Sequence, residues 1–137
     1  MALSTAIYTV LRLNANVLST FGTNIYAGVA PHDTSLPCIV YEIQNIAPTI
    51  AIGSDSDWDE CAIVVTVVGT KHSDVETYAG YIRTALQSYS GTVDTEKIDT
   101  VKYESQSASY DPDWTNPASP AGVGAFMRTL NFTLIRL

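Results

Sequence analysis

Apolar residues near the start of the chain recur at helical spacing. The residues that share this pattern are Ile7, Val10, Leu11, Val17, Leu18 and Phe21. Asn14 and Asn16 interrupt it, and asparagine is unfavourable inside a helix but favourable at helix ends. Gly22 stands where a helix-ending glycine is expected. The pattern predicts a helix near residues 3–13 and a short second helical turn ending at Phe21, either separate or continuous as one bent helix.

Two strands are predicted in the next part of the chain, on either side of an acidic segment. The first is CIVYEIQNI (38–46), which is rich in β-branched and aromatic residues. The second is ECAIVVTVVGT (60–70), whose continuous apolar run is typical of a strand that is central in its sheet or covered on both faces. A connector with a short extended piece at Ile25–Tyr26 precedes them. Between them, APTIAIGSDSDWD (47–59) predicts an excursion with a polar tip.

The segment between His72 and Gly91 has the clearest helical pattern. Ser73 and Glu76 have the spacing of a capping box, and Asp74 is also favourable in a first helical turn. One apolar stripe follows, made of Val75, Ala79, Ile82, Leu86 and Tyr89. Gly91 is placed to end the helix. The sequence therefore predicts a long amphipathic helix here.

Two more strands complete the pattern. The stretch EKIDTVKYESQSASYDP (96–112) predicts a long, more exposed strand, and a proline-rich loop follows it. In the closing stretch AFMRTLNFTLIRL (125–137), apolar and polar residues alternate. Phe126, Leu130, Phe132 and Leu134 share one parity with Arg128, whereas Thr129, Asn131 and Thr133 share the other. This alternation predicts a half-buried strand.

The order of elements predicts the fold class. Helix, strand, strand, helix, strand, strand places short strands in adjacent pairs, which favours antiparallel pairing. We therefore expect an α+β fold, with an antiparallel sheet of about four strands and two helices packed on one face. A chain of 137 residues is close to the commonest domain size, so a single domain over residues 1–137 is expected.

Charge and composition exclude several classes of protein. The net charge of −7, from 7 basic and 14 acidic residues, argues against a protein that grips nucleic acid, because such binding needs clustered Lys and Arg. No apolar run reaches the roughly 18 residues that span a membrane. The first residues lack the basic segment of a signal peptide, so synthesis in the cytoplasm is expected. Cys38 and Cys61 lie in apolar strands and are interpreted as small buried residues, the alternative being a disulfide formed in an oxidising compartment.

The acidic segment that starts at Asp55 is the first candidate site. Asp55, Asp57 and Asp59 alternate like calcium ligands, but a calcium loop needs glycine at its sixth position and glutamate at its twelfth. Those positions hold Glu60 and Thr66, and the second half is an apolar strand. No metal site is therefore expected. The segment is interpreted as a solvated hairpin tip whose carboxylates discourage edge pairing.

Trp58 and Trp114 make the two acidic loops candidates for contact with a partner. Each tryptophan stands among acidic residues, Trp114 next to Asp113, and serves either as a flap over the sheet or as an exposed anchor. The predicted contact residues are Asp55, Asp57, Trp58, Asp59, Glu60, Asp113 and Trp114.

No catalytic residue or cofactor is predicted. His32 and His72 lack a second ligand at metal spacing, and the sequence contains no nucleophile elbow, Walker loop or dinucleotide fingerprint. The absence of site chemistry suggests a structural or binding role.

The segment LRLNANVLSTFGTNIYAGVAPHDTSLPCIVYEI (11–43) resembles the opening of the tail-completion (tail-terminator) proteins of long-tailed bacteriophages. Ile25–Tyr26, Pro31, Leu36–Pro37 and Ile39–Val40–Tyr41 occupy that pattern. Later pieces are also similar: the strand that runs into the Ser73 helix, the turn at Tyr110–Asp111–Pro112, and the closing RTLNFTLIRL.

The resemblance implies a small α+β subunit that forms a ring, commonly a hexamer, on the end of the tail tube. Such a ring stops tube growth, offers a docking surface for the head connector, and lets DNA pass through its lumen without specific binding. The implied partners are other copies of the chain, the tail-tube protein and the head-connector or stopper protein, with no membrane. We expect the Asp55–Glu60 loop to face the lumen or the adjoining ring, and the Trp114 loop to face a neighbour.

Other structural and binding roles remain open at this point. One is a head-side adaptor or stopper, or a tail-tube subunit, of the same particle. Another is a small non-catalytic binding module of the cytoplasm.

Overall fold

The computed structural model describes residues 3–28, 37–51, 54–87, 89–93, 96–111 and 125–136. The helices are α1 (Leu3–Leu13), α2 (Ala15–Phe21) and α3 (His72–Leu86). The strands are β1 (Ile25–Ala27), β2 (Cys38–Ala51), β3 (Ser54–Gly69), β4 (Gly91–Val93), β5 (Glu96–Asp111) and β6 (Ala125–Arg136).

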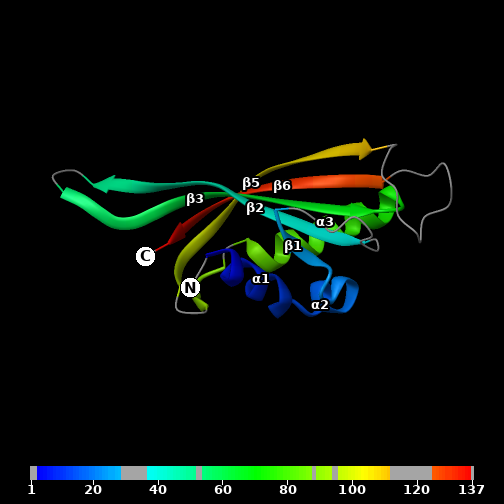
Figure 1. Cartoon of the computed structure of the whole chain (residues 1–137), viewed down its shortest axis with the longest axis horizontal. Coiled ribbons are helices and arrows are strands. Elements are labelled where there is room, and N and C mark those ends of the chain that lie inside the picture. The colour runs from blue at the N-terminus through cyan, green and yellow to red at the C-terminus, as the bar shows by residue number, and fades with distance from the viewer. Residues whose placement is uncertain are drawn as a thin grey trace.

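All six strands belong to one sheet, in the order β1-β2-β3-β6-β5-β4. Neighbouring strands are antiparallel except β1, which is parallel to β2. The predicted antiparallel sheet of about four strands with two helices is therefore wrong, because the described residues form a mixed six-stranded sheet and three helices. Figure 1 shows a long, strongly twisted sheet with the helices below it.

The two strands beyond the predicted four are short, and the four predicted strands are longer than expected. β1 and β4 contain three residues each, too few to show a periodic pattern, although the short extended piece predicted at Ile25–Tyr26 is confirmed as part of β1. Gly91, expected to end a helix, instead begins β4. β2 continues past Ile46 to Ala51, and β3 begins at Ser54 rather than Glu60. Pairing between the two strands holds this polar stretch extended where its own composition predicts a loop.

Asn14 separates the first two helices. Its side-chain Oδ1 accepts hydrogen bonds from the backbone N–H groups of Asn16 at 2.9 Å and Val17 at 3.1 Å, which makes it the N-cap of α2. The helix ends at Gly22, whose φ of 57° lies in the left-handed region that glycine adopts without strain. The two predicted helical pieces are confirmed as separate helices.

Helix α3 buries the first four residues of the predicted stripe but ends at Leu86, before the fifth member Tyr89, and it begins differently. Val75, Ala79, Ile82 and Leu86 are buried. Lys71 holds the N-cap position and makes no side-chain capping bond, so the predicted capping box is wrong. The Arg83 guanidinium lies 4.1 Å from the centre of the Tyr103 ring, which joins α3 to β5.

The core lies between the helices and one face of the sheet. Alternate residues of β3 and β6 point into it, namely Cys61, Ile63, Val65, Val67, Leu130, Phe132 and Leu134. This alternation confirms the predicted parity of β6. The side chains at the other alternate positions of β3 point to the second face of the sheet. Among them, Ala62, Val64 and Thr66 are half-buried. We call this second face the helix-free face, because none of the described helices packs on it (Figure 1).

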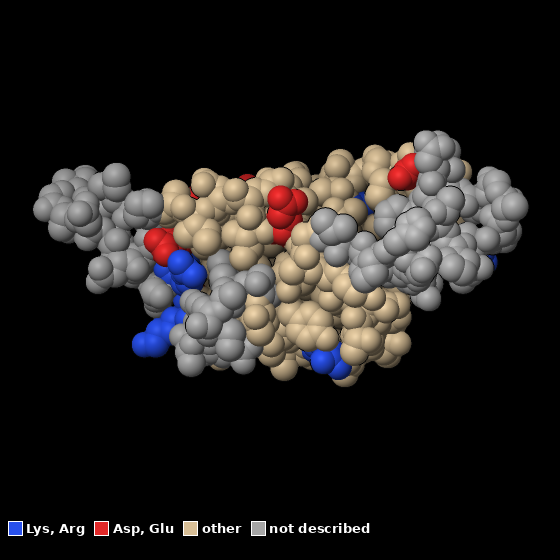
Figure 2. All heavy atoms as spheres, in the orientation of Figure 1, with Lys and Arg blue, Asp and Glu red and all other residues tan. Residues whose placement is uncertain are grey.

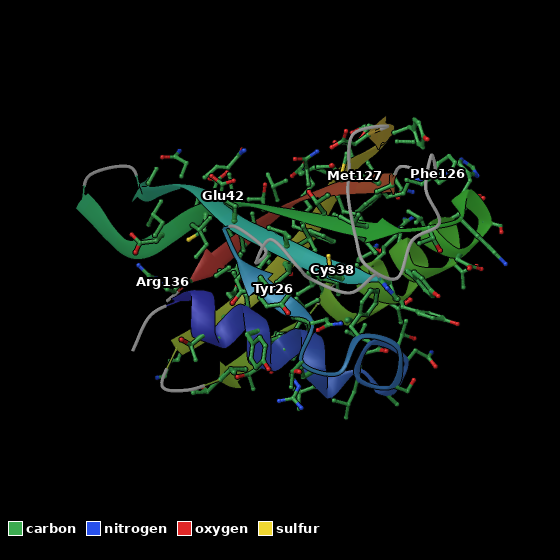
Figure 3. All side chains as sticks on the ribbon, turned by 45° about the vertical axis from the view of Figure 1, so that its right-hand side comes forward. Tyr26, Cys38, Glu42, Phe126, Met127 and Arg136 are labelled. Carbon is green, nitrogen blue, oxygen red and sulfur yellow. The ribbon has the colours of Figure 1, made fainter. Side chains whose placement is uncertain are left out.

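A small separate cluster lies on the helix-free face. It consists of buried Cys38, Val68 and Ala125, with Tyr26 and Met127 packed against them (Figure 3). Cys38 pairs with Val68, which is seven residues along β3 from Cys61, or about 24 Å at the rise of a strand. A disulfide needs Cα atoms within about 7 Å, so the alternative of a Cys38–Cys61 disulfide is excluded, and both cysteines are buried and reduced.

Candidate functional site

β2 and β3 continue beyond the rest of the sheet as a two-stranded arm. The pairing of β6 with β3 ends where Arg136 lies opposite Asp59. β2 and β3 remain paired past this point, as far as Ala51 opposite Ser54. The arm, residues 49–51 and 54–58, extends to the left in Figure 1. The predicted acidic hairpin is thus part of two continuous strands, and it projects from the body.

Asp59 lies at the base of the arm and is paired within the chain. Arg136 Nη2 donates a hydrogen bond to Asp59 Oδ2 at 2.6 Å, and the two residues are direct cross-strand partners. Their side chains are 32% (Asp59) and 22% (Arg136) exposed, so water reaches the pair only in part. Arg136 could not be predicted as the partner of Asp59, because only the register of β3 and β6 brings the two residues together.

The other predicted contact residues are distributed over several places. Glu60 is exposed and lies opposite Ile135, one position from the Asp59 pair. The backbone of β3 places Asp55, Asp57 and Trp58 on the arm. Asp113 and Trp114 lie outside the described residues, so their predicted role stays a prediction.

The two long outer strands each have a covered and an uncovered stretch of edge. β1 pairs with β2 only along Ile39–Tyr41, and β4 pairs with β5 only along Glu96–Ile98. Along Glu42–Ala47 of β2 and Thr100–Ser105 of β5, no strand among the described residues pairs with the outer edge. These edges could not be predicted from the sequence, since they depend on which strands are neighbours.

The helix-free face is mixed: it is polar along much of β5 and β6, more apolar along β2 and β3, and carries few charges. Thr66 and Thr129 bring their hydroxyl oxygens to 3.4 Å, and Asn131 Nδ2 donates to Ser105 Oγ at 3.2 Å. The register places Val40, Glu42, Lys102, Ser107, Ser109 and Thr133 on the same face. On the side shown in Figure 2, charged side chains are scattered rather than gathered in one broad patch of either sign.

Within the described part of the chain, no three His, Cys, Asp or Glu side chains gather as a set that would hold a metal ion. The His72 ring packs edge-on against Phe126, with ring centres 6.0 Å apart, and His32 lies outside the described residues. The features that stand out are therefore an arm, two strand edges and a sheet face without a helix on it, all of which suit contact between proteins.

Comparison with known families identifies one match. The model of the family described as tail completion protein gp17 matches residues 5–117. The chain belongs to the tail completion protein gp17 family. Tail completion proteins are structural parts of phage tails, so this member is a structural, virion-associated tail protein. The family resemblance predicted from the sequence is confirmed.

Comparison with solved structures supports the same fold. A chain in the structure titled "Virion of native gene transfer agent (GTA) particle" superposes with a TM-score of 0.72 at 14% identity. The match covers 99% of this chain and 96% of that chain. At this identity the likeness shows the fold alone. No curated protein sequence matches the chain.

None of the helices in the described ranges is both long and apolar enough to cross a membrane.

Proposed function

We propose that the chain forms a ring that caps the tail tube, ends tail elongation and provides the docking surface for the head connector. The ring is a hexamer of identical subunits. Its partners are the tail-tube protein on one side and the head-connector or stopper protein on the other. Assembly takes place in the host cytoplasm, and the finished ring stays in the virion.

The observation that carries this proposal is the family match over residues 5–117, to proteins that complete the tail. A protein that completes a tail must end a growing polymer and must itself stop growing. A closed ring of identical subunits satisfies both conditions, because its head-to-tail contacts are all used within the ring.

The polar surfaces of the subunit support a role beside passing DNA. A net charge of −7 repels phosphate, and the helix-free face, which carries hydroxyl and amide groups beside apolar residues, offers no cluster of cations among its described residues. A lumen lined by such a surface lets DNA slide without binding it. The arm then projects from the ring toward an adjoining ring, and the Asp55–Glu60 segment, which runs from the arm to its base, contacts that partner.

Native mass spectrometry over a concentration series, alone and with purified tail tubes, tests this proposal. A closed hexamer, alone or on tube ends, is the expected result. Tubes capped by the protein should no longer lengthen when tube subunits are added. Long open polymers would instead identify a tail-tube subunit. A protein that stays monomeric in both settings would contradict the ring.

A further inference from the structure

We propose that the joint between subunits is a β-sheet contact, in which Thr100–Ser105 of β5 in one copy pairs with Glu42–Ala47 of β2 in the next. This inference rests on the proposed ring and specifies how its subunits are held together. The bound partner is thus a second copy of this chain, joined edge to edge.

The edge of β2 has backbone groups that point outward. Ile39 N–H donates to the carbonyl of Asn24, and Gly28 N–H donates to the carbonyl of Tyr41. Residues 39 and 41 therefore turn their peptide groups toward β1, and by alternation along the strand Ile43 turns its own the same way. β1 has ended at this level, so the edge past Tyr41 offers its peptide groups to a further strand (Figure 3 shows Glu42 on this stretch).

The two stretches of the proposed joint, Glu42–Ala47 and Thr100–Ser105, lie at the same height in the sheet. Glu42 lies opposite Val64, Val64 opposite Asn131, and Asn131 opposite Ser105, so Glu42 and Ser105 are on the same row of the sheet. At the other end of the stretch, the row of cross-strand partners runs from Ala47 over Glu60 and Ile135 to Thr100. The two stretches are therefore level and equally long, about 20 Å each at the rise of a strand. A rotation about an axis along the strands brings one beside the other without a vertical shift.

The directions of the strands also fit. β2, β3, β6 and β5 are antiparallel in turn, so β5 runs opposite to β2. When the β5 edge of one copy meets the β2 edge of the next, the new neighbours are antiparallel and the alternation continues around the ring. The two edges are on opposite sides of the sheet, which makes the contact head-to-tail, and closure pairs Glu42–Ala47 with Thr100–Ser105 at every joint of the ring.

Opposite charges meet across this joint. Glu42 and Lys102 are both exposed and both on the helix-free face. At matched height they are diagonal neighbours across the new strand pair, within reach of two long side chains. Lys102 also contacts Glu104 of its own strand at 3.6 Å, a solvent-exposed pair that holds it only weakly.

Each edge carries an irregularity that limits other pairings. Gln44 has no partner on β3, and Glu104 has none on β6, so both outer strands bulge inside the proposed joint. Bulges and edge charges hinder indiscriminate pairing of exposed strands. They therefore disfavour pairing of these edges in other registers.

Hydrogen–deuterium exchange, read peptide by peptide on the monomer and on the assembled ring, tests the joint. Backbone amides in 42–47 and 100–105 should exchange at least about tenfold more slowly in the ring. The central strand residues 61–67 should be protected in both states and serve as the internal reference. A ring in which both edges exchange as fast as in the monomer would overturn the joint but leave the ring intact.

Charge reversal provides an independent test, with ring content read by native mass spectrometry. Glu42→Lys and Lys102→Glu should each raise the dissociation constant of the joint by roughly threefold, and the double variant should restore it. Lys97→Glu makes the same change in the part of β5 already covered by β4, and it should leave ring content unchanged. Failure of the double variant to recover would contradict the proposed pairing. A protein that forms no ring under any condition would overturn the joint together with the proposed function.

Discussion

Asp59 and Arg136 face each other across β3 and β6 and are joined by a 2.6 Å hydrogen bond at the last rung where these strands pair. The pair ties the arm to the body of the sheet. It also means that Asp59 is engaged within its own subunit, which leaves Asp55 and Asp57 as the acidic residues farther out along the arm.

The first prediction concerns this ion pair. Asp59→Asn should lower the free energy of unfolding by about 1 kcal/mol, because the pair is only partly exposed and Arg136 loses its charged partner. Urea denaturation measures the change. Glu60→Gln, an exposed neighbour with the same loss of charge, is the control and should change stability by less than about 0.5 kcal/mol. Equal effects of the two variants would show that the Asp59 pair adds nothing.

The second prediction separates assembly from stability on the arm. The double variant Asp55→Asn/Asp57→Asn should leave the melting temperature within about 2 °C of wild type, because both residues lie past the last residue of β6. It should reduce capping of tail tubes in a tube-lengthening assay. Asp59→Asn should lower the melting temperature more than the double variant does, and it should reduce the capping of tail tubes less. A large drop in melting temperature for the double variant would make the arm a stability element.

The third prediction concerns the close approach of β3 to α3. A Cβ atom on Gly69 would lie 2.7 Å from Val75 Cγ2, closer than side chains tolerate. Gly69→Ala should therefore destabilise the protein by about 1–3 kcal/mol. Adding Val75→Ala removes the clashing methyl group, so the two changes together should cost less than the sum of the single changes.

The matched control for this position is Gly80→Ala in α3. No atom lies within 4 Å of a Cβ placed there, and alanine is the better helix former by about 1 kcal/mol. This variant should stabilise the protein. Destabilisation at both glycines would show that the tight contact with Val75 is not the cause at Gly69.

The fourth prediction concerns the reactivity of Cys38. Burial raises the pKa of its thiol from 9.0 to about 11, so the reactive thiolate is scarcer at pH 8 than in an exposed cysteine. This difference alone should slow alkylation by iodoacetamide about 100-fold, and the rate should rise with pH up to about 11. Peptide mass spectrometry follows the label at Cys38, and the urea-unfolded chain gives the reference rate. Rapid labelling of the folded protein at pH 8 would contradict the burial of this thiol.

Long periodic segments of the sequence predicted their structures well. In α3 an apolar residue recurs at every helical turn, and in β6 at every second residue, because these positions are buried. The structure confirms both patterns within the bounds of α3 and β6. The pieces on either side of Asn14 were also predicted, because a polar side chain that caps a helix leaves a local signal. The capping box failed, since Lys71 supplies the N-cap position one residue before the helix begins at His72.

Features that depend on distant parts of the chain were not predictable in this way. The sequence predicts a short extended piece at Ile25–Tyr26, where β1 lies, but not its pairing with β2, and it does not predict β4, because these three-residue strands are held by their long neighbours. The acidic segment was assigned to a loop because Ser54–Asp59 is polar, yet pairing with β2 extends it. The arm residues were singled out from the sequence, whereas the Arg136 partner and the two level edges required the strand order.

The two-stranded arm has a consequence for the energetics of assembly. A pair of strands without a third neighbour is only marginally stable in water. Binding must therefore fix the arm in one conformation, which costs conformational entropy. The measured affinity is for this reason lower than the contact surface alone would give. Any change that preorganises the arm in the free subunit, such as a better turn or a cross-strand pair, should tighten binding without adding a single contact to the partner.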